Sequence, residues 1–347
     1  IAGFKAENFR TFEKHIAEIE WELYLKRDSI IQCQVSTSLS RLYHTDALAR
    51  RADLAIMEHL GRYPVSRKVP LDNLALWPGD LASPAGDLAS PPGDSGYMPV
   101  DSAPQTVMIR GDNDRFQISI DSSGNLLHKR GIKTVSGRAP LRETLAFGLL
   151  AALGYSGNTT LVDGMCGSGS FPLEAAMISC NIPPGYFRTF AFEGWPCFSP
   201  PAWNHMKKNI CPELLPPLQR GEIKTIFASD IDADMVNALG KTLHDHNLSP
   251  PVQVMQQDFF GMEPVKISRE PGIVVLNPPY GRRMGEPRAV TSLFKDIGKK
   301  LKSDFKGWKA GVIIPDKILA GHLPGSVKLI PLRHGGLDVH GAIFVIP

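Results

Sequence analysis

From residue 141 onward the sequence alternates between short apolar runs and amphipathic stretches, and this alternation constrains the fold more than any other feature. The apolar runs predict strands at 160–163, 225–229, 252–255, 273–276 and 310–314, and the stretches between them predict helices at 141–153, 172–180, 234–246 and 290–301. Strands and helices that alternate in this way form a doubly wound, mostly parallel sheet. Ligands of such sheets bind beyond the carboxyl ends of the strands. We therefore expect an α/β fold whose functional residues directly follow its strands.

The first part of the chain predicts a different arrangement, with helices and strands in mixed order. Residues 4–19 carry apolar side chains at helical spacing, and residues 45–60 do so again. Strands are predicted at 30–35, 107–110 and 116–120. This pattern is typical of a small α+β domain.

One low-complexity stretch, residues 78–96, lies within this first part. It contains the sequence GDLASP twice. A segment this rich in Pro, Gly, Ser and Asp buries too little apolar area to offset the entropy lost on ordering. We interpret it as a flexible surface insertion, and a partner-binding arm is the alternative.

Composition limits the class of protein. Hydrophobic residues make up 43% and charged residues 21%, which is usual for a globular protein. No apolar run reaches the roughly 18 to 20 residues of a membrane span, so no membrane association is expected. Five cysteines without a CxxC pair argue against a disulfide framework or a metal site and favour the cytoplasm. The first residue is Ile1 and no basic leader precedes an apolar run, which favours a piece of a longer, non-secreted protein.

The first chemical motif follows the predicted strand at 160–163. It contains Asp163, Gly164, Cys166, Gly167 and Gly169 in the run DGMCGSGS. The spacing differs from that of dinucleotide fingerprints, and no phosphate-binding lysine follows it. An Asp beside a helix N-terminus suits a zwitterion, because the carboxylate faces an ammonium and the backbone N–H groups face a carboxylate. A purely structural strand–helix turn is the alternative.

Acidic residues also follow the next two strands. Asp230 and Ile231 end the second strand, where an acidic residue accepts hydrogen bonds from a ribose diol, while Asp232 is a candidate helix cap. The run Gln257-Asp258-Phe259-Phe260 follows the third strand, in position for the edge and face of an adenine. A solvated turn is the alternative for Asp258.

The most informative motif is Asn277-Pro278-Pro279-Tyr280, directly after the fourth strand. Two prolines cannot continue a hydrogen-bonded ladder, and they hold the backbone rigid. The Asn277 side-chain oxygen and the Pro278 carbonyl then become fixed acceptors beside the Tyr280 ring. Two acceptors and a ring suit a planar group that bears an NH2. A strand-ending turn is the alternative.

Taken together, these motifs resemble class I methyltransferases that methylate amines. The segments at 127–131, 139–146 and 190–195 are similar to bacterial THUMP-domain rRNA methyltransferases, the UPF0020-like family that makes N2-methylguanine in large-subunit rRNA. Residues 21–23 and 40–45 resemble the end of the THUMP domain, an RNA-binding module. The resemblance implies a Rossmann-like methyltransferase domain at 123–347 and an N-terminally incomplete THUMP-like domain at 1–122.

The resemblance also implies a cofactor, a partner and roles for individual residues. It implies S-adenosylmethionine as methyl donor and RNA, in particular large-subunit rRNA, as partner. The methionine part would lie at the glycine motif, the ribose at Asp230, the adenine at Asp258 and the target amine at residues 277–280. The same resemblance implies that Ala139, Pro140 and Leu141 close over the cofactor.

Other functions remain open on the residues alone. A DNA adenine-N6 methylase and a protein glutamine methylase also accept a planar NH2 group. From another class, an RNA-binding factor without activity is conceivable. The basic run His128-Lys129-Arg130 is interpreted either as a phosphate contact or as a solvated turn.

Overall fold

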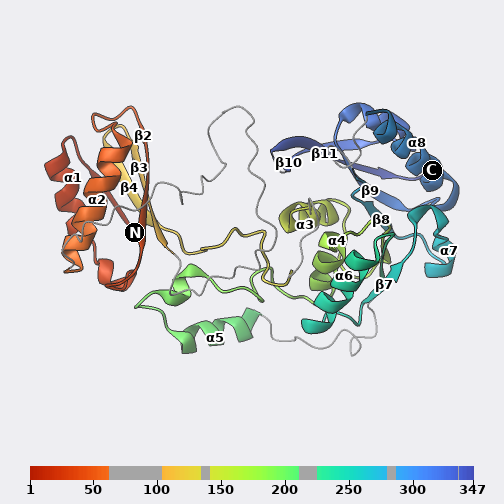
Figure 1. The fold of residues 1–347 in the computed structure, drawn as a ribbon, viewed down its shortest axis with the longest axis horizontal. Helices are drawn as coiled ribbons and strands as arrows, with labels where there is room; N and C mark the ends of the chain where they lie inside the picture. The colour runs from red at the N-terminus through yellow and green to blue at the C-terminus, as the bar shows by residue number, and fades with distance from the viewer. Residues whose placement is uncertain (62–103, 134–140, 211–224, 280–286, 335) are drawn as a thin grey trace. The chain divides into compact units, whose positions relative to one another are not determined.

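The computed structural model describes residues 1–61, 104–133, 141–210, 225–279, 287–334 and 336–347. The insertion predicted at 78–96 lies outside these ranges. Contacts divide the chain into two compact units (Figure 1). Unit 1 contains Ile1–Asn125 and Thr189–Pro201, and unit 2 contains Leu126–Arg188 and Ala202–Pro347. The sequence places its domain boundary at 122, and the contacts place theirs after Asn125.

Unit 1 is built on a four-stranded sheet with the order β1-β4-β3-β2. Its strands are β1 (Ala2–Lys5), β2 (Ile31–Ser38), β3 (Gln105–Asp112) and β4 (Arg115–Ile120). Strands β2 and β3 are parallel, and the other two pairs are antiparallel. Buried and accessible residues alternate along β3 and β4, so the sheet packs one face against a core.

The core of unit 1 is completed by helices α1 (Phe9–Ala17) and α2 (Thr45–His59). Phe12 and Ile16 of α1 and Ile56 of α2 are fully buried in one cluster with the sheet. The expectation of a helix over 4–19 is wrong at its start. Residues 2–5 pair with β4 instead, and the Asn8 side chain caps α1 by accepting a hydrogen bond from the Thr11 N–H at 2.9 Å.

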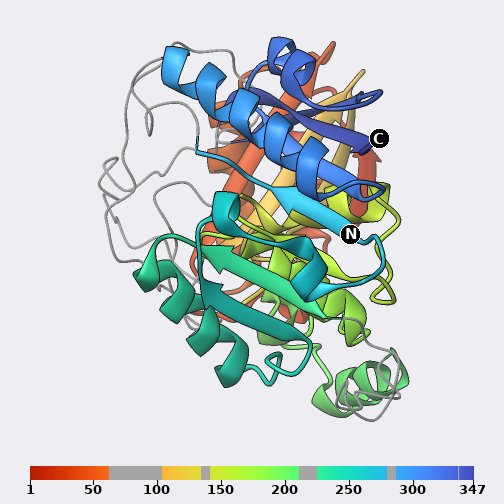
Figure 2. The same cartoon turned by 90° about the vertical axis from the view of Figure 1, so that its right-hand side faces the viewer.

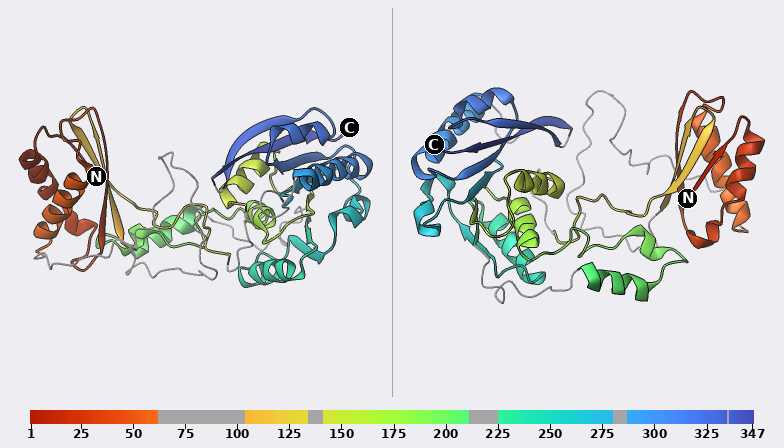
Figure 3. Two further views of the ribbon diagram at one scale, coloured as in Figure 1. Left: turned by 45° about the horizontal axis from the view of Figure 1, so that its top comes forward. Right: turned by 180° about the vertical axis from the view of Figure 1, so that it is seen from behind.

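Unit 2 contains a seven-stranded sheet with the order β10-β11-β9-β8-β5-β6-β7. Its strands are β5 (Leu161–Asp163), β6 (Ile226–Asp230), β7 (Val252–Gln256), β8 (Ile273–Leu276), β9 (Lys309–Ile314), β10 (Lys328–His334) and β11 (Leu337–Val345). Strands β5 to β9 are mutually parallel, and β11 is antiparallel to both its neighbours. The hairpin of β10 and β11 and the strand β7 lie at opposite edges (Figure 3).

Helices cover both faces of this sheet. They are α3 (Glu143–Ala152), α4 (Ser170–Ser179), α6 (Ala233–Asp245), α7 (Pro264–Ile267) and α8 (Pro287–Asp304). A further helix, α5 (Pro200–Ile210), has no buried residue. Residues of α3, α4 and α6 pack in one core cluster with Ile273 and Val275. Residues of α8, which runs along the sheet in Figure 2, pack in another with Val274 and Leu276. The predicted doubly wound architecture is therefore confirmed.

The strand order creates one point where the chain changes direction across the sheet. Strand β5 lies between β6 and β8, so the connections after β5 and after β8 leave to opposite sides. A crevice forms outside the carboxyl ends of strands at such a point. None of the helices in the described part of the chain is long and apolar enough to cross a membrane.

Candidate active site

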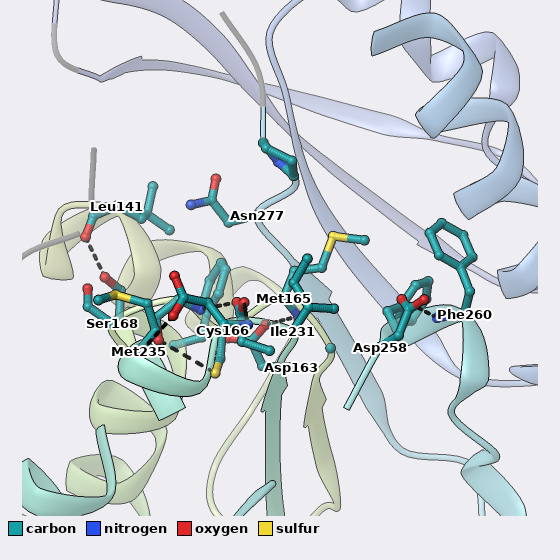
Figure 4. A pocket seen from close by; sticks show the side chains of 18 of the residues that line it. Leu141, Asp163, Met165, Cys166, Ser168, Ile231, Met235, Asp258, Phe260 and Asn277 are labelled. Carbon is teal, nitrogen blue, oxygen red and sulfur yellow. Dashed lines mark hydrogen bonds between the residues drawn. The ribbon is translucent and has the colours of Figure 1, made fainter. Parts of the chain in front are cut away.

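A cavity of about 680 Å³ lies at the carboxyl ends of β5, β6 and β8 in unit 2 (Figure 4). It therefore occupies the position that the strand order favours. Of the residues singled out in the sequence, its wall contains Leu141, Asp163, Gly164, Cys166, Gly167, Asp230, Ile231, Asp258, Phe259, Asn277 and Pro279. The fold thus brings together motifs that are separated by more than a hundred residues in the chain.

Two of the predicted site residues that the structure describes, Gly169 and Pro278, are not part of this wall. Ala139, Pro140 and Tyr280 lie outside the described residues. Gly169 begins α4 with a φ of +86°, and a Cβ there would stand 2.3 Å from Leu239. Its role is therefore helix packing, with no lining contact. Pro278 is buried and lies in the chain between Asn277 and Pro279, which both line the cavity.

The glycine turn after β5 uses its other two glycines differently. A Cβ on Gly164 would stand 2.3 Å from the ring of Phe259, so the strand end packs tightly against the residue that follows β7. Gly167 has a φ of +51°, and no described atom lies within 4 Å of the Cβ position there. The backbone at Gly167 is therefore open to the cavity, as a close approach of a ligand requires.

Asp230 fixes the glycine turn from the neighbouring strand. One carboxylate oxygen accepts a hydrogen bond from the Gly167 N–H at 2.8 Å, and the other accepts from the Asp232 N–H at 3.0 Å. Asp232 caps α6 by accepting from Asp234 N–H at 2.9 Å, which confirms its predicted role. Each Asp230 oxygen keeps a second lone pair with which it can accept from a ligand hydroxyl.

Asp163 lies at the floor of the cavity with 1% of its surface exposed. Burial raises the pKa of this carboxyl well above its usual value, the Met165 N–H opposes the rise, and the nearby charge of Asp230 adds to it. A nearby cation stabilises a buried carboxylate more strongly than it stabilises a carboxylate in water. The site therefore favours a positively charged ligand group next to Asp163.

Asp258 and the two residues after it form the far end of the cavity. The Asp258 carboxylate accepts a hydrogen bond from the Phe260 N–H at 3.1 Å and caps the short helix η5 (Phe259–Gly261). For one of its two carboxylate oxygens, this contact agrees with the interpretation of Asp258 as a turn residue. The ring of Phe260 is partly exposed in the cavity wall and offers a flat apolar surface.

The corner after β8 contains an unusual polar atom. The Asn277 side-chain oxygen is buried, and no described residue donates a hydrogen bond to it. A buried acceptor without a donor costs about 1–3 kcal/mol. Asn277 also lines the cavity, above the floor of carboxylates in Figure 4. The geometry therefore leaves an acceptor for a donor that the described chain does not supply.

Several residues of the wall were missed by sequence reasoning. They are Met165, Ser168, Ser170, Phe171, Met235 and Leu293. Asp232, the predicted helix cap, and Phe260, part of the segment predicted at the adenine, line the wall as well. The first four missed residues belong to or directly follow the glycine motif, so their position in the run was a usable signal. Met235 and Leu293 lie on α6 and α8, and the sequence places no local motif there. Only the packing of these helices brings them to the cavity.

Arg130, the last residue of the basic run before α3, is neither part of a solvated turn nor available for a phosphate contact, so both interpretations are wrong for this residue. Its guanidinium donates two hydrogen bonds to the Glu174 carboxylate, at 2.8 and 3.1 Å, and a third to the Leu127 carbonyl. The two side chains are 7% and 2% exposed. Arg130 therefore joins this segment to α4 from inside the protein.

Comparison with known proteins identifies a family and several relatives of this chain. The family model described as "RMKL-like, methyltransferase domain" matches residues 130–325. A Synechocystis sp. protein provisionally assigned as RNA methyltransferase slr0064 is 29% identical over 345 residues, 97% of this chain and 79% of that protein. The ribosomal RNA large subunit methyltransferase K/L of Vibrio parahaemolyticus is 31% identical over 236 residues, 67% of this chain and 33% of that protein. This chain therefore matches about a third of the K/L relative.

A solved structure supports the fold. The crystal structure of SMU.472, described as a methyltransferase complexed with SAH, matches with a TM-score of 0.70 at 23% identity. The match covers 100% of this chain and 83% of that one. It confirms the predicted fold class, the Rossmann-like sheet of class I methyltransferases.

Proposed function

Because the chain belongs to the RMKL-like methyltransferase family, we propose that it methylates the exocyclic N2 amine of guanine in RNA. Family membership confirms two sequence-based predictions, that the protein is an enzyme and that S-adenosylmethionine is its methyl donor. The observation that supports the choice of an amine is the buried oxygen of Asn277 in the cavity wall, to which none of the described residues donates a hydrogen bond.

The described residues fit S-adenosylmethionine. The amino-acid part of the donor carries an ammonium, and the buried Asp163 favours such a positive charge. The same part of the donor can approach the backbone of Gly167 closely, because no side chain stands between them. Its ribose can donate to the free lone pairs of Asp230, and its adenine can lie against Phe260. When bound, S-adenosylmethionine supplies an electrophilic methyl group on a sulfonium. We assign Asp163, Gly164, Cys166 and Gly167 to the amino-acid part, and Asp230, Ile231, Asp258 and Phe259 to the nucleoside.

The chain's own contribution to catalysis is orientation. In this proposal the Asn277 oxygen and the Pro278 carbonyl accept the two protons of the amine, so the nitrogen lone pair points into the cavity. The same oxygens stabilise the positive charge that develops on the nitrogen. A conjugated amine is a weak nucleophile, so alignment at near-attack distance is the main source of rate. Tyr280 would stack on the base, and Pro279 keeps the corner rigid.

The RNA partner is supported by the relatives. One is named for RNA and the other for large-subunit ribosomal RNA. We propose that residues 1–122 form a THUMP-like RNA-binding domain and that residues 123–347 form the methyltransferase domain. We also propose that the protein acts in the cytoplasm, which its five cysteines without a CxxC pair favour. A base in a helix must leave its stack to reach the Asn277 corner.

The test is transfer of a labelled methyl group by purified protein to unmodified ribosomal RNA, followed by nucleoside analysis. Label in N2-methylguanosine is expected. Asn277→Ala should lower the rate by about 10²-fold, the effect of removing one donor or acceptor that acts on developing charge. Its affinity for S-adenosylhomocysteine should stay within about threefold of the wild type, a difference of only some 0.7 kcal/mol.

Each other class predicts a different outcome of the same experiment. Label in N6-methyladenine of DNA would replace the proposal by a DNA methylase, and label in glutamine by a protein methylase. Cofactor binding with no transfer to RNA, DNA or protein would indicate an RNA-binding factor without activity.

A further inference from the structure

A chain of hydrogen bonds lies behind one end of the cavity. The Ser170 hydroxyl donates to the Leu141 carbonyl at 2.6 Å and accepts from the Lys133 ammonium at 2.7 Å. The Glu143 carboxylate lies 2.9 Å from the same ammonium. The side chains of Lys133 and Glu143 are each only 10% exposed. These contacts are therefore largely shielded from water, unlike those of an ordinary surface ion pair.

This chain of contacts touches the cavity at two residues. Ser170 and Leu141 belong to the wall, whereas Lys133 and Glu143 stand behind it. Figure 4 shows Leu141 and Ser168 at one end of the cavity and Asp258 and Phe260 at the other. The two ends correspond to the amino-acid part and the nucleoside part of the donor in the proposed function. The contacts therefore lie at the amino-acid end.

The chemistry of the contacts fixes the wall at this end. A serine hydroxyl rotates freely unless both its proton and its lone pairs are engaged. Here the Lys133 ammonium occupies a lone pair, so the proton points to the Leu141 carbonyl. Glu143 holds the ammonium in place by a charge-assisted contact, which is stronger than a neutral hydrogen bond. Residues 133 and 141 are consequently tied to the first residue of α4.

We propose that Lys133, Glu143 and Ser170 are positioning residues for the amino-acid end of the methyl donor. Lys133 acts through Ser170 and Leu141 and does not touch the reacting atoms. The inference rests on the proposed use of S-adenosylmethionine at this cavity. It assigns a task to Lys133, which belongs to none of the sequence motifs, and to Glu143 and Ser170, which lie in the segment 139–146 and in the glycine motif but had no role assigned to them there.

The test compares two ligands by calorimetry on the full chain. S-Adenosylhomocysteine has the amino-acid part, and 5′-methylthioadenosine has the same nucleoside without it. Lys133→Met should weaken binding of S-adenosylhomocysteine about tenfold, the equivalent of one charge-assisted hydrogen bond of some 1.4 kcal/mol. The dissociation constant of 5′-methylthioadenosine should change by less than about twofold. Lys133→Arg, which keeps the cation, should recover most of the affinity.

A matched serine controls for damage to the helix. Ser179 lies on the same helix α4, where its hydroxyl donates to the Ala175 carbonyl and bonds the Tyr155 hydroxyl, and it does not line the cavity. Ser170→Ala should reproduce the selective loss, and Ser179→Ala should leave both ligands unaffected. Ser170→Ala also keeps the test informative if Lys133→Met does not fold.

The possible results separate the two proposals. Equal affinity of wild type and both variants for S-adenosylhomocysteine would refute the positioning role while leaving the methyltransferase assignment intact. An equal loss for both ligands would refute it too, because the cavity would then have been damaged as a whole. Absence of any binding by the wild type would instead overturn the proposed function.

Discussion

Among the described residues, exposed ion pairs occur in both units, but buried charged side chains occur in unit 2 alone. In unit 1 the pairs Arg41–Glu7 and Arg51–Glu13 lie at the surface, with each side chain at least 37% exposed. In unit 2 the Arg130–Glu174 pair is 7% and 2% exposed, and Asp163 is buried without a cation among the residues that the structure describes. Surface contacts lower the pKa of Glu7 and Glu22, whereas burial raises that of Glu174 and Asp163.

The difference indicates where charge serves function. Exposed ion pairs contribute little to stability because water and salt screen them. Buried ions cost free energy unless a partner compensates them, so a fold retains them only where something else requires them. In unit 2 Asp163 lines the cavity and Lys133 and Glu143 stand behind it, whereas none of the charged residues that the structure describes in unit 1 is buried. Three variants test this contrast.

The largest effect is expected for Glu174→Gln in unit 2. The substitution leaves the Arg130 guanidinium buried without its carboxylate, which should lower the free energy of unfolding by about 3–5 kcal/mol. Chemical denaturation measures this loss. The double variant Arg130→Met with Glu174→Met should recover most of it, since no unpaired charge then remains. A double variant as unstable as Glu174→Gln would show that the pair is needed for its geometry instead.

An intermediate effect of opposite sign is expected for Asp163→Asn. A raised pKa means that the folded protein without ligand gains stability as the pH falls through that pKa and loses it as the pH rises. The amide removes this cost, so Asp163→Asn should stabilise the ligand-free protein at pH 7 by about 1–2 kcal/mol. Its melting temperature should also depend less on pH than that of the wild type over the range from the ordinary pKa of an aspartate up to the raised pKa of Asp163, because there the folded wild type binds more protons than the unfolded chain.

The same variant should fail to bind S-adenosylhomocysteine, because the amide gives up the charge that faces the ammonium. Such an exchange of stability for function is typical of active sites. A less stable Asp163→Asn protein would contradict the view that this carboxyl is retained for a ligand.

The smallest effect is expected for Glu13→Gln in unit 1, the surface counterpart of Glu174→Gln. Its loss of the contact with Arg51 should change the free energy of unfolding by less than about 1 kcal/mol. The change should vanish at about 1 M salt, where screening acts over some 3 Å. A loss as large as that in unit 2 would remove the contrast between the two units.

Much of the fold could be predicted because burial leaves a strong pattern in the sequence. Strand β8 is buried on both faces, and its apolar run was predicted with the correct bounds. Strands β1, β10 and β11 were missed. Exposure is mixed along the hairpin of β10 and β11, so their runs are neither continuously apolar nor regularly alternating. Strand β1 alternates, but over only four residues at a sheet edge. The edge pairing of β1 with β4 depends on a partner more than a hundred residues away.

The sequence by itself determined the chemistry of the site, namely a glycine turn, carboxylates after successive strands and an Asn-Pro-Pro corner. Local order suffices for these because each motif follows its own strand and parallel strands end at one edge. Only the tertiary structure decided which distant groups meet: Asp230 on the Gly167 N–H, Arg130 on Glu174 and Lys133 on Ser170. These pairs join residues 37 to 63 positions apart, and no periodicity or turn preference acts over that distance.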